Sequence, residues 1–256
     1  MERNLLLTIE YDGSEFSGWQ RQPERRTVQG ELERVLTKVC GVPVQINGTS
    51  RTDAGVHALG QRASFKLNSG IPTDKVKLAA NNILAGGKNL ASQVGDVRII
   101  DIEEKDDAFH ARFDSKGKMY RYVIYNGDDQ NIFRRKYCYQ VATPLDVDAM
   151  AEASKHIVGT HDFACFQSAG GQDRETTVRT VYSLNVFRDG KDVVIEIAGD
   201  GFLYNMVRII TGTLVEVGLG KRKPEDLISI IESTDRKKAG HKAPAEGLYL
   251  VEVYYE

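Results

Sequence analysis

The sequence predicts an α/β fold, because strand-like and helix-like patterns follow one another along its whole length. Short apolar stretches with alternating residues, such as 119–125, are typical of strands. Longer segments such as 28–39 repeat apolar residues at the spacing of one helical face. With 256 residues, 41% of them hydrophobic and 27% charged, the chain is long enough for one large or two small domains.

The first half of the chain is predicted to form strands and helices around a glycine-rich loop. Its expected elements are, in order, a strand at 5–11, a helix at 28–39, a short strand at 44–46, a strand at 61–67, a helix at about 73–84 and a strand at 97–102. The first strand ends at Asp12-Gly13, which is a turn signal, and Thr27 stands where it caps the first helix. We therefore expect residues 1–113 to form one α/β half.

The second half repeats this style. Its expected elements are a strand at 119–125, a helix at 147–158 that ends at Gly159, strands at 181–187 and 193–198, a helix at 202–217, a helix from Pro224 to about Ser233 and a strand at 247–254. Asp189-Gly190 predicts a hairpin turn between the two middle strands. We expect residues 114–256 to form the second α/β half.

Composition and motifs argue against several classes of function. The three cysteines lack Cys-x-x-Cys spacing, and no two histidines stand four residues apart, so neither a zinc site nor a disulfide framework is predicted. Dinucleotide, Walker, zinc-hydrolase and serine-esterase motifs are missing from the sequence. We expect no cofactor and no metal. The N-terminus lacks a signal-peptide pattern and no apolar run is long enough to span a bilayer, so we expect a cytoplasmic protein.

Four basic clusters stand out, although the formal net charge is only −2. They lie at 21–26, 134–136, 221–223 and 236–242. A single run of charge is usually a solvated face, but four runs, two of them beside aromatic residues, favour a cleft lined for phosphates. Trp19, next to the first cluster, is either a ring that stacks on a base or a core residue.

The loop from Gly48 to His57 concentrates more reactive groups than packing requires. Asp53 is its only anion, and Gly48 and Gly55 allow positive φ and close approach to a ligand. Asp53 is therefore a candidate nucleophile or general base. The alternative interpretation is that Asp53 caps a short turn and that Arg51 is merely solvated.

A carboxylate that reacts as an anion benefits from a nearby cation, which keeps it ionised by lowering its pKa. Arg51 and Arg208 are the candidates for this cation. Arg208 lies in the predicted helix at 202–217 among apolar neighbours, and an arginine at such a border needs a carboxylate partner. The alternative is an ordinary surface arginine on an amphipathic helix.

Cys165, with His161 and Asp162 just before it, superficially resembles a thiol nucleophile with its base. Catalytic cysteine and histidine are normally distant in sequence and meet only in the fold. We interpret this cluster as a packed turn after a helix.

Taken together, these segments resemble the tRNA pseudouridine synthase A family, and the resemblance covers nearly the whole chain. The most specific match is the string Arg51-Thr52-Asp53-Ala54-Gly55-Val56-His57. Further matches, in the family's order, are Tyr11-Asp12-Gly13, Gly18-Trp19-Gln20, Thr27-Val28-Gln29, Phe109-His110-Ala111-Arg112-Phe113, Tyr120-Arg121-Tyr122, His161-Asp162-Phe163, Val178-Arg179-Thr180, the segment 201–208 and Ala243-Pro244-Ala245.

The resemblance implies the pseudouridine synthase fold, in which two similar α/β halves join their sheets into one mixed or antiparallel sheet with a central active-site cleft. It implies an isomerase that acts on tRNA as a homodimer. The reaction moves the ribose bond of a uridine from N1 to C5 at position 38, 39 or 40 of the anticodon stem-loop, without cofactor or metal.

The resemblance also assigns roles. Asp53 matches the catalytic aspartate, which attacks either C1′ of the ribose or C6 of the uracil. Tyr120 matches the tyrosine that packs on the base, and Arg208 matches the basic partner of the aspartate. Arg51 is expected to help extrude the base from the stem.

Four further residues are expected to contact the RNA, namely Thr52, His57, Arg21 and Arg25. Ser50 stands where many family members have glycine, a departure that affects the entry to the loop rather than the chemistry. A rival hypothesis from another class is a module that binds and remodels tRNA without chemistry, which the basic clusters and aromatic residues also fit.

Overall fold

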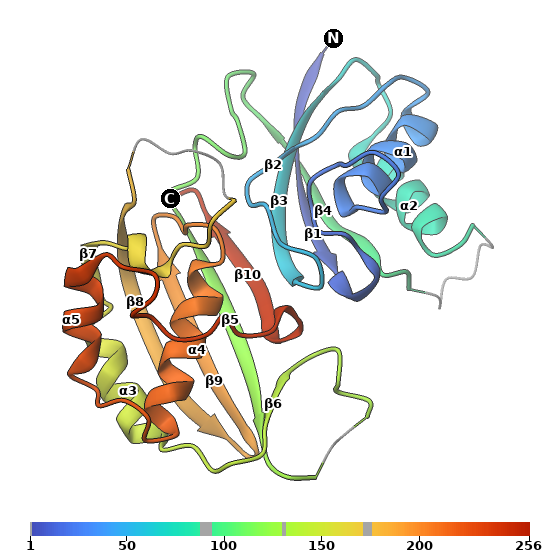
Figure 1. The fold of residues 1–256 in the computed structure, drawn as a ribbon. Coiled ribbons are helices and arrows are strands. Elements are labelled where there is room, and N and C mark those ends of the chain that lie inside the picture. Colours follow the sequence, from blue (N-terminus) through green and yellow to red (C-terminus); the bar gives the residue numbers. More distant parts are fainter. Residues whose placement is uncertain (1, 88–93, 130–131, 171–175) are drawn as a thin grey trace. The chain divides into compact units, whose positions relative to one another are not determined.

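The structure is a computed structural model that describes residues 2–87, 94–129, 132–170 and 176–256 (Figure 1). Its strands are β1 (Arg3–Tyr11), β2 (Asn47–Gly48), β3 (His57–Leu67), β4 (Val97–Lys105), β5 (Gly117–Asn126), β6 (Tyr139–Val141), β7 (Gly159–Asp162), β8 (Val178–Asp189), β9 (Asp192–Gly199) and β10 (Leu248–Tyr254). Its α-helices are α1 (Val28–Cys40), α2 (Thr73–Leu84), α3 (Val147–Lys155), α4 (Met206–Gly218) and α5 (Asp226–Ser233). Short 3-10 helices lie at Gly13–Glu15, Ala164–Phe166 and Ala245–Gly247.

The chain divides into two compact units. The first comprises Met1–Lys116 and Leu250–Glu256, and the second comprises Gly117–Tyr249. Both units combine helices with strands, and the ten strands belong to one mostly antiparallel sheet, which confirms the predicted fold class. Residues 250–256 group with the first unit, whereas the sequence-based division assigned them to the second half; the boundary at 113/114 stays a prediction.

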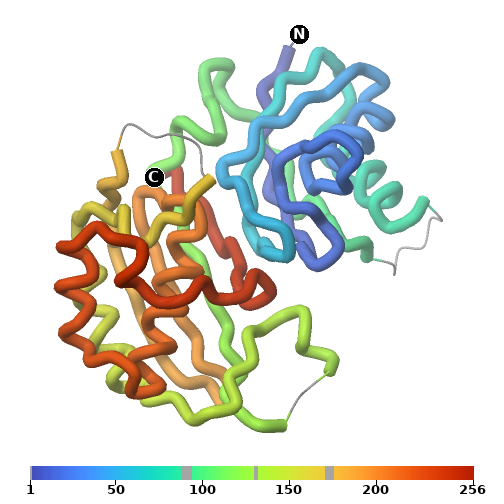
Figure 2. Tube along the Cα trace, in the orientation of Figure 1, coloured from blue at the N-terminus to red at the C-terminus, as the bar shows by residue number. Residues whose placement is uncertain are grey.

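The first unit is built on β1, which pairs antiparallel with β3 on one side and with β4 on the other. Leu5, Leu6 and Leu7 are all fully buried, so β1 does not alternate, because both of its faces are covered. Helices α1 and α2 pack against each other, and α2 packs on β4 (Figure 2). The apolar residues of α1 are buried, as the amphipathic pattern predicted.

The other face of β1 is occupied by the segment 106–111. Asn4 Nδ2 donates to the carbonyl oxygens of Asp106 and Phe109 at 2.9 and 2.7 Å. The N–H of Ala111 donates to Ser64 Oγ at 3.1 Å, and Ser64 lies opposite Leu6 in the ladder between β1 and β3. These bonds to buried side chains explain why a segment without regular structure packs on the sheet.

The predicted strand at 44–46 is wrong; the pairing with β3 begins only at Asn47. The physical reason is that side chains of α1 take the main-chain donors of this segment. The N–H of Val44 donates to Thr37 Oγ1 at 3.0 Å, and the N–H of Ile46 donates to the buried carboxylate of Glu33 at 3.0 Å. The apolar side chains of Val44 and Ile46 nevertheless enter the core, as the pattern indicated.

In the second unit the strands run in the order β5-β9-β8-β7, each pair antiparallel. The predicted hairpin joins β8 to β9, with Gly190 at φ 58. Helix α3 packs on β8 and on α4, so helices cover these strands (Figure 1). The sequence did not predict β6, which pairs parallel with β5, or β7, because each is shorter than the alternation needed to recognise a strand.

Three helices differ from prediction at one end. Helix α5 begins at Asp226, two residues after the predicted start at Pro224. Helix α3 ends at Lys155 instead of 158, and tighter turns lead from there to Gly159 at φ 115. Helix α4 begins at Met206 instead of 202, because Asn205 adopts the left-handed conformation and no helix passes through it. None of the described helices is long and apolar enough to cross a membrane.

Candidate active site

The Asp53 loop lies in the first unit, between β2 and β3, and rests on the core. Trp19 is 1% exposed, and its main-chain N–H donates to the carbonyl oxygen of Thr52 at 3.0 Å. Gly48 packs so closely on the indole that a Cβ there would lie 2.4 Å from it. Trp19 is therefore a core residue that supports the loop, and the alternative in which its ring stacks on a base is wrong.

Gln61 of β3 fixes the start of the loop. Its side chain is fully buried, with Oε1 accepting from the Ser50 N–H at 3.2 Å and Nε2 donating to the Ser50 carbonyl at 2.8 Å. Both main-chain polar groups of Ser50, the residue immediately before Arg51, are thereby held. Ser50 Oγ is itself buried and without a hydrogen-bond partner among the described residues.

Asp53 opens a tight turn. Its main-chain carbonyl accepts from the Val56 N–H at 3.2 Å, and Gly55 sits within the turn at φ 80. A main-chain bond thus closes this turn, so the fold does not need an aspartate side chain for that purpose. Asp53 is half-buried.

The two residues before Asp53 differ sharply. Thr52 is buried, and its Oγ1 shares a hydrogen bond of 2.7 Å with the Tyr11 hydroxyl. Arg51 is exposed and makes no hydrogen bond or ion pair with any of the residues that the structure describes. Of the two, Arg51 has its guanidinium available for a ligand.

His57 serves the fold. The imidazole is almost fully buried, and its Nδ1 accepts from the Gly13 N–H at 3.1 Å and lies 3.3 Å from Asp12 Oδ1. These contacts tie the turn at 12–13 to the start of β3. The predicted contact of His57 with RNA stays a prediction, and the burial of the ring gives it no support.

The first basic cluster is partly neutralised within the unit. Arg21 pairs with the buried carboxylate of Glu33 at 3.0 Å. Arg26 pairs with Asp96 at 2.6 Å and lies 4.1 Å above the Phe16 ring, and the Asp96 hydrogen bond raises its pKa. Arg25 is exposed and makes no ion pair within the described part of the chain. The predicted contacts of Arg21 and Arg25 with RNA are untested.

The other basic clusters are also partly engaged. Arg134 pairs with Asp192 at 2.7 Å, and Arg222 pairs with Glu216 at 2.6 Å. Arg236 donates to the carbonyl oxygen of Gly240 at 2.9 Å. The ion pairs of Arg134 and Arg222 offset part of the positive charge that the sequence runs indicated, whereas Arg236 keeps its charge.

In the second unit Tyr120 lies on β5, opposite Ile197 of β9. Its ring is 8% exposed and meets Phe202 edge-on, with 5.2 Å between ring centroids and an interplanar angle of 86°. An edge-to-face pair of this kind favours one ring orientation. Tyr120, which the resemblance expects to pack on the target base, is thus held in one orientation.

Arg208 lies in the first turn of α4 and is half-buried. Its Nε donates to the carbonyl oxygen of Ala243 at 2.8 Å, and its Nη1 donates to Asn205 Oδ1 at 3.0 Å. The main chain of Arg208 also accepts from the Ala243 N–H at 3.0 Å. The interpretation of Arg208 as an ordinary surface arginine is therefore wrong, because its guanidinium is fixed by neutral acceptors within this unit.

The segment that holds Arg208 is a strap, residues 239–244, that runs along one face of α4. The Gly240 N–H donates to Thr213 Oγ1 at 2.9 Å, and Tyr122 donates its hydroxyl proton to the Pro244 carbonyl at 2.7 Å. At Gly212 a Cβ would lie 1.9 Å from the His241 carbonyl oxygen, so only glycine permits this approach.

Glu216 fastens the strap at its other end. Its carboxylate accepts from the N–H and Nδ1 of His241 at 3.0 and 3.2 Å and from Arg222 Nε at 2.6 Å. Burial works against the charged form of Glu216, but the donors of Arg222 and His241 outweigh it and lower the pKa of the carboxyl. One ionised side chain thus anchors the segment that carries Ala243 to Arg208.

Sequence reasoning missed Gln61, Asn205 and Glu216. A glutamine in a strand and a glutamate in a helix have no distinctive spacing, and their roles depend on partners 11 to 25 residues away. Asn205 carried one usable signal. Asparagine tolerates the left-handed conformation better than other non-glycine residues, and it stands directly before an apolar helical pattern.

The cluster around Cys165 is packed structure rather than the turn after a helix that the sequence predicted: His161 and Asp162 end strand β7, and Cys165 lies in the 3-10 helix that follows. The thiol is fully buried and burial raises its pKa to about 12, so it is not a thiolate at neutral pH. His161 Nε2 contacts the carbonyl oxygen of Val158 at 3.2 Å, and Asp162 accepts from the Ala164 N–H at 3.0 Å. Neither side chain bonds the sulfur.

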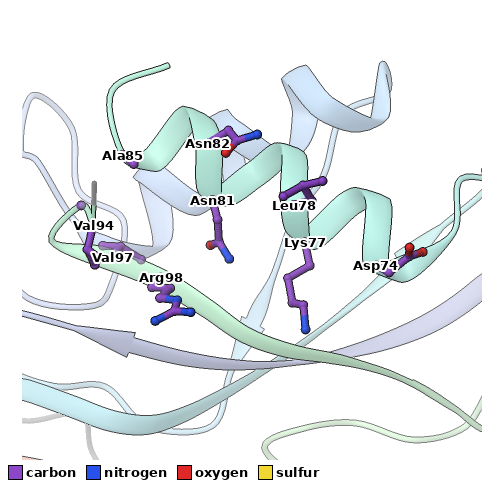
Figure 3. Close-up of a pocket in the computed structure, with 10 residues that line it drawn as sticks. Asp74, Lys77, Leu78, Asn81, Asn82, Ala85, Val94, Val97 and Arg98 are labelled. Carbon is purple, nitrogen blue, oxygen red and sulfur yellow. The ribbon is translucent and has the colours of Figure 1, made fainter. Parts of the chain in front are cut away.

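A hollow of about 580 Å³ lies between α2 and the start of β4 (Figure 3). Asn81 there exchanges hydrogen bonds of 2.8 and 2.9 Å with the main chain of Ile99, and Lys77 Nζ donates to the Ile100 carbonyl at 3.3 Å. These side chains serve to join α2 to β4. The hollow shares no residue with the Asp53 loop, and the described residues contain no group of three acidic, histidine or cysteine side chains able to hold a metal.

Comparison with known proteins identifies the class. Residues 7–114 and 153–256 match the family described as tRNA pseudouridine synthase, which comprises isomerases with the pseudouridine synthase fold. The tRNA pseudouridine synthase A of Acetivibrio thermocellus is 49% identical over 99% of this chain and 100% of its own length. The tRNA pseudouridine synthase A of Brevibacillus brevis is likewise 49% identical, and tRNA pseudouridine synthase A 2 of Clostridium tetani is 47% identical, each over its full length and at least 99% of this chain. The chain therefore belongs to the tRNA pseudouridine synthase A family.

Proposed function

We propose that the protein converts uridine to pseudouridine at positions 38, 39 and 40 of the anticodon arm of tRNA, with Asp53 as the nucleophile. The observation that carries the proposal is the build of the Asp53 turn. Its backbone is fixed by the Val56 hydrogen bond and by the bonds of Gln61 to Ser50, three residues upstream of Asp53. The aspartate is half-buried and lies two residues after the available Arg51. A carboxylate on a rigid backbone is suited to attack a reactant held in one position.

The isomerisation needs no external reactant. The N1–C1′ bond of the uridine breaks, a C5–C1′ bond forms, C5 loses its proton and N1 gains one. A carboxylate oxygen of Asp53 supplies the electron pair for a transient bond, either to C1′ or to C6, and recovers it when the C5–C1′ product forms. The two orders of events remain alternatives.

Tyr120 and Arg208 complete the proposed machinery. The Tyr120 ring, held by Phe202, packs on the uracil and assists removal of the C5 proton. The Arg208 guanidinium favours the ionised form of Asp53 as its partner. Neutral acceptors on the strap and at Asn205 orient that guanidinium without neutralising it.

The exposed Arg51 is proposed to help the target base leave the stem. A uridine inside a helix must be flipped before C5 or C6 is reached, at a cost of a few kcal/mol in lost stacking and pairing. A guanidinium stacks well on the faces of aromatic rings, including the bases beside the flipped nucleotide. The remaining proposed contacts, by Thr52, His57, Arg21 and Arg25, rest on the resemblance.

The decisive experiment is tritium release from tRNA labelled at uracil C5. We expect Asp53→Asn to fold normally, to bind tRNA and to release no tritium. Asp74→Asn makes the same change on the exposed face of α2 and should match the wild type. Full tritium release by a folded Asp53→Asn variant would remove Asp53 as the nucleophile, whereas RNA binding without release by the wild type would favour a binding module.

Position specificity is tested with anticodon stem-loops that carry one uridine at 38, 39, 40 or elsewhere in the arm. Conversion confined to the three named positions is the expected result, and conversion at another site would contradict it.

We further propose a homodimer in the cytoplasm. Light scattering should give twice the chain mass of 28.5 kDa, and a fully active particle of single mass would contradict the dimer.

A further inference from the structure

Asn205 has a backbone that its position before α4 does not require. Its φ of 62° and ψ of 9° lie in the left-handed region, which any residue with a Cβ enters at a steric cost that is smaller for asparagine than for most. Its side chain makes no capping hydrogen bond to the helix that follows. A glycine would adopt the same backbone without the steric cost, so the local fold does not explain the asparagine side chain.

The orientation of the Asn205 amide follows from its partner. Arg208 Nη1 donates to Oδ1 at 3.0 Å, and a guanidinium has donors only. The atom that faces Arg208 must therefore be the oxygen, which removes the usual ambiguity between the two ends of an amide. Nδ2 is consequently the other end of a side chain that is already held.

That Nδ2 is buried and has no acceptor among the residues that the structure describes. The whole residue is 8% exposed. A buried donor without an acceptor destabilises the fold, and buried polar groups in folded proteins nearly always find a partner. Asn205 thus combines a strained backbone with an unsatisfied donor, next to the proposed catalytic Arg208.

Strain and unsatisfied donors persist mainly where a ligand uses them. We infer that Asn205 Nδ2 donates a hydrogen bond to a carbonyl oxygen of the target uracil, and so makes Asn205 a residue that binds the target base. This inference rests on the proposed function, because it takes the target uridine to lie against Arg208. A neutral amide hydrogen suits the neutral carbonyl of a base better than a phosphate, for which charged donors are preferred.

The proposed bond would also read the base. Uracil presents carbonyl oxygens at C2 and C4, whereas cytosine presents a donor, its amino group, at C4. A fixed NH₂ group facing position 4 can donate to the oxygen of uracil. Opposite cytosine it would meet another donor, so that a buried polar group would be left unpaired, and the enzyme would strongly reject this base. At position 2 the same donor would bind either pyrimidine.

The test measures single-turnover rates on anticodon stem-loops that carry uridine, 4-thiouridine or 2-thiouridine at the target position. Sulfur accepts hydrogen bonds more weakly than oxygen, so the wild type should be slowed about tenfold or more by one of the two thio substitutions. Asn205→Asp keeps an acceptor for Arg208 and tolerates the left-handed backbone but loses the NH₂. Asn205→Gly removes the side chain and the strain.

Both variants should be slow on uridine, and the ratio of their rates on uridine and on thio RNA should fall from the wild-type value toward the ratio set by the intrinsic reactivity of the two bases. Intrinsic differences in the reactivity of the thio bases affect every enzyme equally and cancel in this comparison. Thr234→Gly is the matched control. Thr234 also has a left-handed backbone, at φ 53, but it is exposed beyond α5, so its variant should keep the wild-type ratio.

An unchanged thio penalty in both Asn205 variants would overturn the inference and reduce Asn205 to a positioning residue for Arg208. If instead the wild type lost rate on RNA with 2′-deoxyuridine at the target position and the variants did not, the amide would contact the ribose. This result would also overturn the inference. If the variants are too slow to assay, dissociation constants of the same RNAs in an Asp53→Asn background give the ratio. The proposed function fails separately, if Asp53→Asn itself releases tritium.

Discussion

The side chain of Gln61 holds both main-chain polar groups of Ser50, with a hydrogen bond of 2.8 Å to the carbonyl and one of 3.2 Å from the N–H. Ser50 stands three residues before Asp53, so a strand of the core fixes the entry to the proposed catalytic turn. Because Gln61 is fully buried, no water competes for these bonds. The loop is rigid at the end that faces the sheet.

Gln61→Met should therefore reduce both stability and turnover. A methionine of similar length leaves the Ser50 N–H and carbonyl without partners, at about 1–3 kcal/mol for each buried group. We expect the free energy of unfolding in urea to fall by about 2–4 kcal/mol. Turnover should fall at least tenfold, since a shift of about 1 Å in a reacting group can cost 100-fold.

Gln45→Met is the control for this change, because Gln45 is exposed and precedes the same loop. Its unfolding curve and single-turnover rate should match those of the wild type. If Gln61→Met matched Gln45→Met in both measurements, the clamp on Ser50 would have no role in placing Asp53.

The strap along α4 makes a second prediction, at Gly212. Any Cβ at this position meets the main-chain oxygen of His241 at 1.9 Å, and main chain cannot move aside without displacing the strap. We expect Gly212→Ala to lower the free energy of unfolding by about 1–3 kcal/mol, as overpacking of a core does. Because Ala243 accepts from Arg208, turnover should fall as well.

Gly70→Ala provides the comparison, since nothing lies within 4 Å of a Cβ at Gly70. Its variant should be as stable and as active as the wild type in the same urea and single-turnover assays. A Gly212→Ala variant that kept wild-type turnover while losing stability would separate the strap from the function of Arg208.

The sequence predicted the order of the main helices and strands, and the reason lies in periodicity. Helix α1 was visible because its apolar residues recur on one face beside a capping Thr27, whose Oγ1 accepts from the Gly30 N–H at 3.2 Å. The strand expected at 44–46 failed because that pattern reports burial only. It does not report that Thr37 and Glu33 take the main-chain donors.

The candidate site was predictable where chemistry is concentrated in one string, and not where it depends on distant partners. Asp53 and Arg51 stood out because reactive groups between glycines are rare in packed structure. The hydrogen bond that orients Arg208 could not be predicted, because its acceptor on Ala243 is a main-chain carbonyl, which any residue would supply. The predicted pairing of Asp53 with Arg208 stays a prediction.

Cys165 should take no part in the reaction. Burial raises the pKa of its thiol to about 12, so the thiolate is scarce throughout the physiological range. We expect the native protein to resist alkylation by iodoacetamide at Cys165 and to react there only after unfolding. Cys165→Ala should keep the wild-type rate of tritium release. Rapid alkylation of the native thiol together with loss of activity would revive the thiol hypothesis.

The ionised Glu216 predicts a pH dependence of stability. Its pKa in the folded protein lies below its ordinary value of 4.5, so folding favours the carboxylate over the acid. The stability that it contributes is therefore fully present above about pH 4.5 and is lost as the pH falls through the lower, folded pKa. Glu216→Gln removes this contribution, which for charge-assisted hydrogen bonds is about 1.5–3 kcal/mol.

We expect the difference in unfolding free energy between the wild type and Glu216→Gln to be largest near pH 7 and to shrink toward pH 3. Glu232→Gln makes the same change of charge at an exposed position of α5, and so controls for net charge. Urea unfolding of the three proteins across this pH range measures the effect. If this difference in unfolding free energy stayed constant with pH, neutral packing, and not the ionised carboxylate, would anchor His241 and the strap. If the difference grew in acid, the sign of the linkage would be reversed and the lowered pKa of Glu216 would be excluded.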